Sequence, residues 1–283
     1  MLKRILLMKK ITVVTVCFNC VGIIEQTIKS VISQDYPELE YIIIDGASQD
    51  GTLNIVYKYQ NYITKILSEP DKGIFDAMNK SLNYVTGKYI LFMNAGDTFA
   101  NEHIVSDIFK DYNGDDDLLY GDDYVLNNLG YMKRHAHAIY EHPFTIRDLV
   151  FKSQGFSHQS LFTKTEQLQR VKFCLKFPLG ADYHTTYKVF MTGNHKLKYV
   201  GFPISVFDDR NGGASHNGKF MIQIYIERKT MFKYEFSFLD KVILLWKNIR
   251  CNSKYYLSKL FPYLISVYRI KNRNYINLNS ATL

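Results

Sequence analysis

The chain has 283 residues and 47% of them are hydrophobic, a content that supports a large buried core and excludes a disordered chain. The formal net charge is +8, but residues 216–283 hold 12 basic and 3 acidic side chains, whereas residues 1–215 hold 23 and 24. Four cysteines do not make a disulfide framework in a chain of this length, so we expect free thiols.

Strands and helices are predicted to alternate through the first hundred residues. β-Branched runs such as Ile11–Phe18 are typical of buried strands, and apolar residues at intervals of three and four indicate amphipathic helices. The predicted order is a strand over 11–18, a helix over 24–32, a strand over 39–44, a helix from about 53, a short strand near 66–67, a helix over 74–85 and a strand over 89–93. This order favours a doubly wound α/β domain, with a mostly parallel sheet and helices on both faces.

Acidic residues follow several of these strands. Asp45 ends the strand over 39–44, Asp71 precedes the helix over 74–85, and Asp97 follows the strand over 89–93. Because open α/β sheets bind ligands at the carboxyl ends of their strands, Asp71 and Asp97 are predicted to reach the rim of one crevice. A carboxylate at the position of Asp45 can accept hydrogen bonds from a base or a sugar.

Two short patterns near these acids do not support the functions that they first suggest. The turn Asp45–Thr52 lacks both G-x-G-x-x-G and G-x-x-x-x-G-K-[ST], which argues against a dinucleotide fold and a P-loop. Cys17 and Cys20 form a C-x-x-C, but Cys17 belongs to an apolar strand, which favours packing over redox chemistry. Gly87 is expected to end the helix over 74–85.

The middle of the chain is predicted to continue the same α/β domain. The predicted elements are a helix near 102–109, two strands over 117–131 with a hairpin tip at 127–130, a short strand over 157–162, a helix over 182–191 that begins with an acidic residue, and a strand over 198–207. A loop rich in glycine and asparagine follows over 208–218.

Residues 238–250 combine an apolar helical face with a basic one. The apolar face carries Trp246, and lysine and arginine lie mostly opposite. This pattern is typical of a helix lying in a membrane interface, and packing of the apolar face on the domain is an equal alternative. No recognised nucleic-acid module accompanies the basic face, so no nucleic-acid partner is expected. We find neither a secretory signal nor a spanning segment and expect a cytoplasmic protein, peripheral at most on the inner face of the cell membrane.

Four stretches in order carry a family resemblance: Thr15–Asn19, Ile44–Thr52, Glu69–Lys80 and Gly87–Asp97, followed by shorter matches at Tyr120–Asp122, His158–Gln159 and Ala181–Asp182. With these stretches the chain resembles the family 2 glycosyltransferases, the inverting nucleotide-sugar enzymes of bacterial polysaccharide assembly, from about residue 11 to about residue 215. The resemblance implies a GT-A fold.

The resemblance also implies roles for single residues. A nucleotide-sugar pocket would be lined by Thr15, Asn19, Asp45, Asp71, Lys72 and Asn94, with a divalent metal (Mg²⁺ or Mn²⁺) at Asp97 and the catalytic base at Asp182. Contacts with the acceptor or the diphosphate are implied for His158, Gln159, Asp122 and His216. The family motif Asp-x-Asp is replaced here by Asn94-Ala95-Gly96-Asp97, and one carboxylate is still enough for Mg²⁺ when phosphates complete its shell.

The function implied is a non-processive hexosyltransferase, because the Gln-x-x-Arg-Trp motif of the family's processive synthases is missing. It would move one sugar from a nucleotide-diphosphate sugar, expected to be a UDP-sugar, to a glycan or lipid-linked acceptor in bacterial surface polysaccharide synthesis. The alternative is a catalytically inactive GT-A-like protein that binds nucleotide or glycan at the membrane. The expected domains are a glycosyltransferase domain over 1–215, with a nucleotide-sugar half (1–100) and an acceptor half (101–215), and a basic amphipathic helical region over 216–283.

Overall fold

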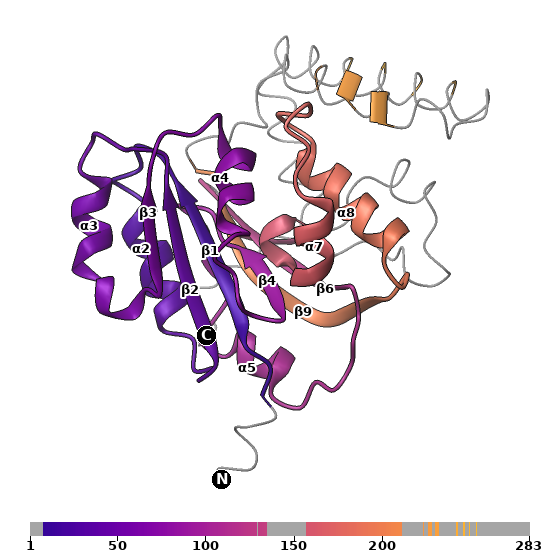
Figure 1. Ribbon diagram of the computed structural model, residues 1–283, viewed down its shortest axis with the longest axis horizontal. Helices are drawn as coiled ribbons and strands as arrows, with labels where there is room; N and C mark the ends of the chain where they lie inside the picture. The colour runs from indigo at the N-terminus through magenta and orange to yellow at the C-terminus, as the bar shows by residue number, and fades with distance from the viewer. Residues whose placement is uncertain are drawn as a thin grey trace.

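The structure is a computed structural model (Figure 1). It describes residues 8–128, 130–134 and 157–210. From the C-terminal region it describes Gln223, Ile226, Glu227, Thr230, Met231, Val242, Trp246, Ile249 and Ser253.

A sheet of nine strands forms the centre of the described part of the chain. Its first half is parallel, as predicted, and consists of β1 (Ile11–Cys17), β2 (Leu39–Asp45), β3 (Lys65–Ser68) and β4 (Tyr89–Phe92) in the order β3-β2-β1-β4. Cys17 pairs with Asp45 and Asp45 with Ser68. The carboxyl ends of these three strands are therefore level with one another.

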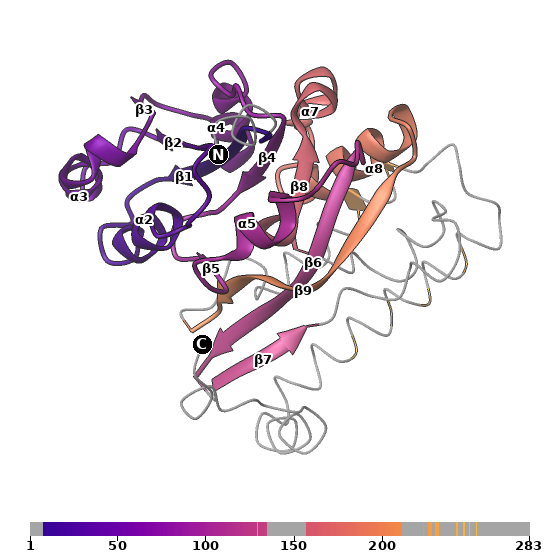
Figure 2. The same cartoon turned by 90° about the horizontal axis from the view of Figure 1, so that it is seen from below.

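The second half of the sheet is mixed (Figure 2). It consists of β8 (Leu161–Lys164), β6 (Leu118–Asn127), β9 (Leu197–Asp208) and β5 (Thr98–Phe99), with β7 (Gly130–Arg134) paired to β6. β8 lies antiparallel between β4 and β6, whereas β6 and β9 run parallel. The predicted hairpin tip is confirmed, since Asn127 pairs with Gly130.

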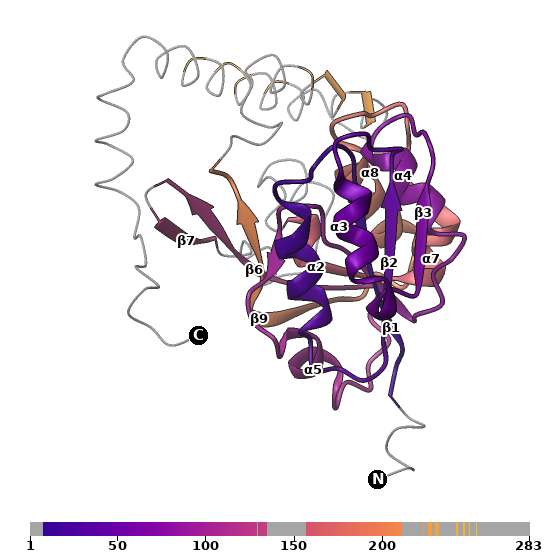
Figure 3. The ribbon, with the colours of Figure 1, turned by 90° about the vertical axis from the view of Figure 1, so that its left-hand side faces the viewer.

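Helices cover both faces of the sheet, as predicted (Figure 3). One face carries α2 (Ile24–Ile32), α3 (Thr52–Lys58) with the 3-10 turn η1 (Gln60–Tyr62), and α5 (Ile104–Phe109); the other carries α4 (Ile74–Ser81), α7 (Thr165–Val171) and α8 (Ala181–Thr192). Successive strand residues point to opposite faces, so Val13 joins the first core and Val14 the second. The cysteines of the described part, Cys17, Cys20 and Cys174, are free thiols, as expected.

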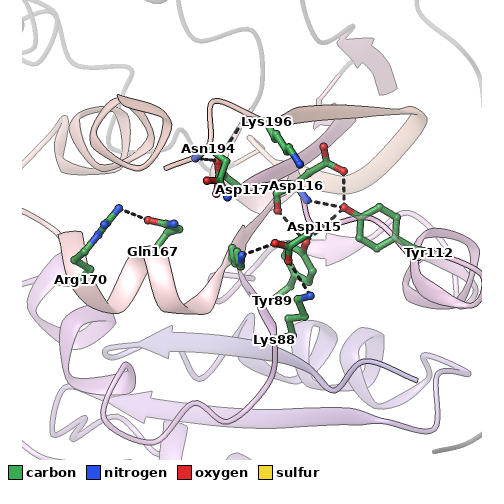
Figure 4. A network of polar contacts seen from close by, with 11 residues as sticks. Lys88, Tyr89, Tyr112, Asp115, Asp116, Asp117, Gln167, Arg170, Asn194 and Lys196 are labelled. Carbon is green, nitrogen blue, oxygen red and sulfur yellow. Dashed lines mark hydrogen bonds and ion pairs between the residues drawn. The ribbon is translucent and has the colours of Figure 1, made fainter. Parts of the chain in front are cut away.

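A polar network holds the end of the sheet that lies away from the predicted site (Figure 4). Asp115 accepts bonds from Lys88 and Lys164 at 2.8 Å each, and these two lysines lower its pKa to about 2. Asp117 is buried and accepts the backbone N–H of Asn194 at 2.5 Å. The network joins the start of β4 and β6 to the connection between α8 and β9.

Two local predictions in this region are wrong. The helix α4 ends at Ser81, so Gly87 does not end it. The segment over 157–162 is not one strand, because residues 158–160 form the 3-10 turn η2 (His158–Ser160) before β8. Gly87 instead allows a close approach of two backbones: a Cβ there would lie 2.5 Å from Thr12 Oγ1 and 2.6 Å from Thr12 N.

Gly87→Ala is therefore expected to lower the free energy of unfolding by about 1–3 kcal/mol, the usual cost of overpacking a filled core. Urea denaturation measures this change through the transition midpoint. Gly22→Ala is the matched control, since a Cβ at Gly22 meets nothing within 4 Å. Equal midpoints for the two variants would contradict the packing role of Gly87.

Candidate active site

Asp45 and Thr15, two predicted pocket residues, are buried at the carboxyl end of the parallel strands. Asp45 has no exposed surface, and its Oδ2 accepts bonds from Ser48 N at 2.9 Å and Ser68 Oγ at 2.7 Å. Thr15 is equally buried, and its hydroxyl bonds to that of Tyr41 at 2.9 Å. Asp45 thus holds the turn after β2, Thr15 joins β1 to β2, and neither side chain is brought to the surface of the site.

A pocket of about 220 Å³ opens beside them and is lined by Val16, Cys17, Phe18, Asp71, Gly73, Ile74 and Ala77. Gly46 makes room for the carboxylate of Asp71, because a Cβ at position 46 would lie 2.5 Å from Asp71 Oδ2. Asp71 Oδ1 accepts the Gly73 N–H at 2.7 Å. Phe18 is 62% exposed and Ile74 43%. One carboxylate between apolar walls suits a flat heterocycle that donates hydrogen bonds.

Asn19 and Lys72 lie in the loops around this pocket. Asn19 adopts a left-handed backbone conformation with φ of 46°, and its Oδ1 accepts the Gln49 N–H at 2.9 Å. It thereby joins the loop after β1 to the turn after β2. Lys72 is exposed, and its backbone N–H donates to Asp76 Oδ2 at 3.0 Å. Both predicted residues are thus at the edge of the sheet where the site was expected.

Asp97 lies in the loop after β4 and is only 5% exposed. Its Oδ2 accepts Gln159 Nε2 at 2.7 Å and its Oδ1 accepts the backbone N–H of Asp208 at 3.2 Å. Burial raises the pKa of Asp97 to about 6, although these two hydrogen bonds act in the opposite direction. Thr27, in α2, donates its hydroxyl to the Asp97 carbonyl at 2.7 Å. The loop is therefore fixed from α2, η2 and β9 together.

His158 joins Asn94 to Asp182. Asn94 Nδ2 lies 2.7 Å from His158 Nε2, and His158 Nδ1 lies 3.4 Å from Asp182 Oδ2. In this arrangement one ring nitrogen of His158 faces the Asn94 amide and the other faces the Asp182 carboxylate. The sheet order brings the three together, since η2 precedes β8, the neighbour of β4. The side chains of His158 and Asp182 keep 23% and 20% exposure, so both are accessible.

Asp122 is not part of this cluster. Asp122 is buried, and its Oδ1 accepts the hydroxyl of Tyr199 at 2.8 Å, which ties β6 to β9. His216 lies outside the described residues. Sequence reasoning missed Gln26 and Thr27, whose side chains bond to Gly96 and Asp97. Their signal is weak, since both are polar residues in an amphipathic helix.

Asp97 and Asn94, the residues of the predicted metal motif, could offer oxygen donors to a divalent metal. Among the described residues, no group of three or more His, Cys, Asp or Glu side chains could hold a metal ion. However, Asn94 Oδ1 is buried and has no hydrogen-bond partner in the described part, and a nearby cation would offset the burial cost of the Asp97 carboxylate. One carboxylate and one amide oxygen fit a Mg²⁺ or Mn²⁺ ion that takes its other ligands from substrate phosphates and water.

Comparison with known proteins identifies the family. The model of glycosyl transferase family 2 matches residues 12–192, well over half of the chain. The chain is 27% identical over 176 residues to an uncharacterized glycosyltransferase of Mycobacterium tuberculosis, covering 61% of this chain and 65% of that one. A putative teichuronic acid biosynthesis glycosyltransferase of Bacillus subtilis is 32% identical over 97 residues, covering 33% of this chain and 38% of the relative.

Solved structures agree with this match at the level of the fold. S. aureus TarS 1-349 in complex with UDP-GlcNAc has a TM-score of 0.61 at 18% identity, covering 83% of this chain and 70% of that chain. The mannosyltransferase PcManGT of Pyrobaculum calidifontis, in complex with GDP-Man and Mn²⁺, has a TM-score of 0.56 at 18% identity, covering 85% and 69%. The fold is therefore GT-A, and the chain belongs to glycosyl transferase family 2.

Proposed function

We propose that the protein is a non-processive, inverting glycosyltransferase that moves one sugar from a nucleotide-diphosphate sugar to an acceptor hydroxyl. The arrangement of Asp182, His158 and Asn94 carries the proposal, because it sets an accessible carboxylate beside the loop that holds Asp97. Membership of family 2 supports it. Both relatives described above are glycosyltransferases by name, which supports it as well. The chain spans 65% of the length of the first relative and 38% of the second.

The catalytic base in this proposal is Asp182. An acceptor hydroxyl is a poor nucleophile and needs a proton acceptor as it attacks the sugar. His158, between Asp182 and Asn94, keeps the carboxylate directed into the site. A single attack on the face opposite the leaving diphosphate inverts the anomeric carbon.

Asp71, Asn19 and Lys72 are proposed to bind the donor, with its base in the pocket that Phe18 and Ile74 border. A UDP-sugar is the donor that we propose, supported by UDP-GlcNAc in the TarS structure. Asp97 and the amide oxygen of Asn94 would hold a divalent cation, and Mn²⁺ beside GDP-Man in PcManGT supports this assignment. The cation would offset the charge that develops on the leaving diphosphate.

The proposed acceptor is a glycan or a lipid-linked intermediate of bacterial surface polysaccharide synthesis, reached from the cytoplasmic face of the membrane. The teichuronic acid relative supports this class of acceptor. The test uses the purified chain with a panel of nucleotide sugars, with Mn²⁺ or with chelator. We expect one donor to raise the melting temperature by mass action and to be turned over only with metal. Stabilisation without turnover would favour the inactive alternative. If no nucleotide sugar either stabilises the protein or is turned over, the proposal is overturned.

The C-terminal region is proposed to contact an anionic membrane. Val242, Trp246 and Ile249 are helical and 37%, 71% and 57% exposed, and their spacing sets them on one helical face. The surrounding residues 216–283 carry the excess of basic side chains. The helices in the described part of the chain are all too short or too polar to span a bilayer, so the proposed contact is interfacial.

The double variant Trp246→Ser/Ile249→Ser is expected to reduce co-sedimentation with vesicles of phosphatidylglycerol and phosphatidylcholine by about tenfold or more, because it removes the apolar part of the contact. Binding of the wild type is expected to weaken at high salt. Tyr62→Ser, which replaces a side chain that is 66% exposed in η1, is the matched control. Unchanged sedimentation of the double variant would contradict the membrane contact.

A further inference from the structure

Glu227, a residue of the C-terminal region, is buried against the glycosyltransferase domain. The residue is only 3% exposed. Its Oε2 accepts the backbone N–H of Gly180 at 3.0 Å and that of Leu179 at 3.3 Å. Gln223 donates to its Oε1 at 3.2 Å. A buried carboxylate is costly unless donors compensate it, and here the compensating donors include backbone groups 47 and 48 positions earlier in the chain.

The groups that Glu227 contacts form the start of α8. Gly180 is the residue immediately before the helix, and no side chain of its own caps the helix start. Helices often satisfy this backbone N–H with a glutamate three residues further along. Glu227 supplies the same contact from a distant segment. A Cβ at position 180 would lie 3.4 Å from Glu227 Oε2 and 3.2 Å from the methyl carbon of Met231, so the two segments are closely packed.

Asp182 lies in the first turn of this helix, two residues after Gly180. Its carboxylate faces His158 at 3.4 Å, so a small shift or rotation of the helix start changes the direction in which Asp182 points. The neighbouring Ala181 is fully buried and packs in the second core. Glu227 therefore holds the helix start on its outer side, while the core holds it on the inner side.

We propose that Glu227 is a positioning residue for the reaction: by binding the Leu179–Gly180 backbone it fixes the direction of the Asp182 carboxylate. The inference rests on the proposed role of Asp182 as the base. Part of the C-terminal region would thus help to position the base. This role does not depend on whether the exposed face at Trp246 contacts a membrane. No bond is made or broken by Glu227 itself.

The test compares Glu227→Ala with Glu227→Gln, Gln223→Ala and Asp182→Asn in the full-length protein. Misplacement of a catalytic group by about 1 Å can cost roughly 10²-fold in rate, so we expect Glu227→Ala to lower kcat for transfer by about 10- to 100-fold. The donor dissociation constant is expected to stay within about twofold, since the contact is not part of the donor pocket. Glu227→Gln keeps an oxygen acceptor and is expected to restore most of the rate. Gln223→Ala, which leaves both backbone bonds, should behave like the wild type.

Two readouts separate positioning from general destabilisation. The positioning role predicts loss of kcat without loss of donor affinity, together with faster amide exchange at residues 179–182. A transfer rate of Glu227→Ala within twofold of the wild type would overturn the positioning role. It would also be overturned if the donor affinity and the rate of this variant both fell in proportion to its folded fraction. If Glu227→Ala does not fold, Glu227→Asp, which keeps the charge but shortens the reach, is read by the same criteria. If Asp182→Asn transfers normally, the proposed base is wrong; if Asp182→Asn is inactive and Glu227→Ala is not impaired, only the positioning role fails.

Discussion

Asp182→Asn is expected to lower kcat for sugar transfer by about 10²- to 10⁴-fold, the usual contribution of a general base. Asparagine has nearly the same size and can still bond to His158, but it cannot accept the proton of the acceptor hydroxyl. The donor dissociation constant is expected to change little, because Asp182 lies in the first turn of α8 and does not line the pocket at Asp71. Steady-state transfer assays and donor titration measure the two quantities separately.

Asp107→Asn is the matched control, since Asp107 is also an acidic residue in the first turn of a helix, α5, and is exposed away from the cluster. This control should transfer sugar at the wild-type rate. Wild-type transfer by Asp182→Asn would mean that another group accepts the proton, and His158 would be the next residue to test. A loss of donor affinity in Asp182→Asn would instead place Asp182 in the donor pocket.

Local sequence patterns were sufficient for the parallel half of the sheet. Buried β-branched runs such as Ile11–Cys17 have few alternatives to a strand, and the helices between them show the expected spacing. The second half depends on pairings between distant segments, such as β8 between β4 and β6. Spacing does not encode such pairings. The segment before β8 shows the same limit, because residues 158–160 form a 3-10 turn in which His158 contacts Asn94 and Gln159 contacts Asp97.

The site could be predicted as a set of residues but not as a set of contacts. The motifs named Asp97, His158 and Asp182, yet their grouping depends on the sheet order. The burial of Thr15 follows from strand alternation, which puts it on the same face of β1 as Val13 in the first core. No sequence pattern indicated a role for Glu227, which is one of three acidic residues in the basic region 216–283. Its role depends on a tertiary contact with Gly180.

Asp97→Asn is expected to abolish metal-dependent transfer and, in the metal-free protein at neutral pH, to stabilise the fold. The first effect follows because Asp97 is the carboxylate proposed to hold the cation, so a Mn²⁺-induced rise in melting temperature should be present in the wild type and absent in the variant. Isosteric asparagine can keep both hydrogen bonds once the amide of Gln159 turns over. Transfer by the wild type that is insensitive to chelator would contradict the metal assignment.

The stability effect follows from the raised pKa of Asp97, about 6 because of burial, against about 3.9 in an unfolded chain. Between these pH values Asp97 loses its proton in the unfolded state but keeps it in the folded state. The burial of Asp97 therefore does not lower the free energy of unfolding below about pH 4. It lowers it increasingly from pH 4 to about pH 6, and by a constant amount above pH 6. The full cost is roughly 3 kcal/mol at most.

Urea denaturation in chelator should therefore find Asp97→Asn more stable than the wild type at pH 8, with a smaller difference at pH 5. Asp115→Asn is the control of opposite sign, since Lys164 and Lys88 hold the pKa of Asp115 at about 2, and it should gain no stability at pH 8. A less stable Asp97→Asn at pH 8 would mean that Gln159 and the Asp208 backbone more than compensate the buried charge.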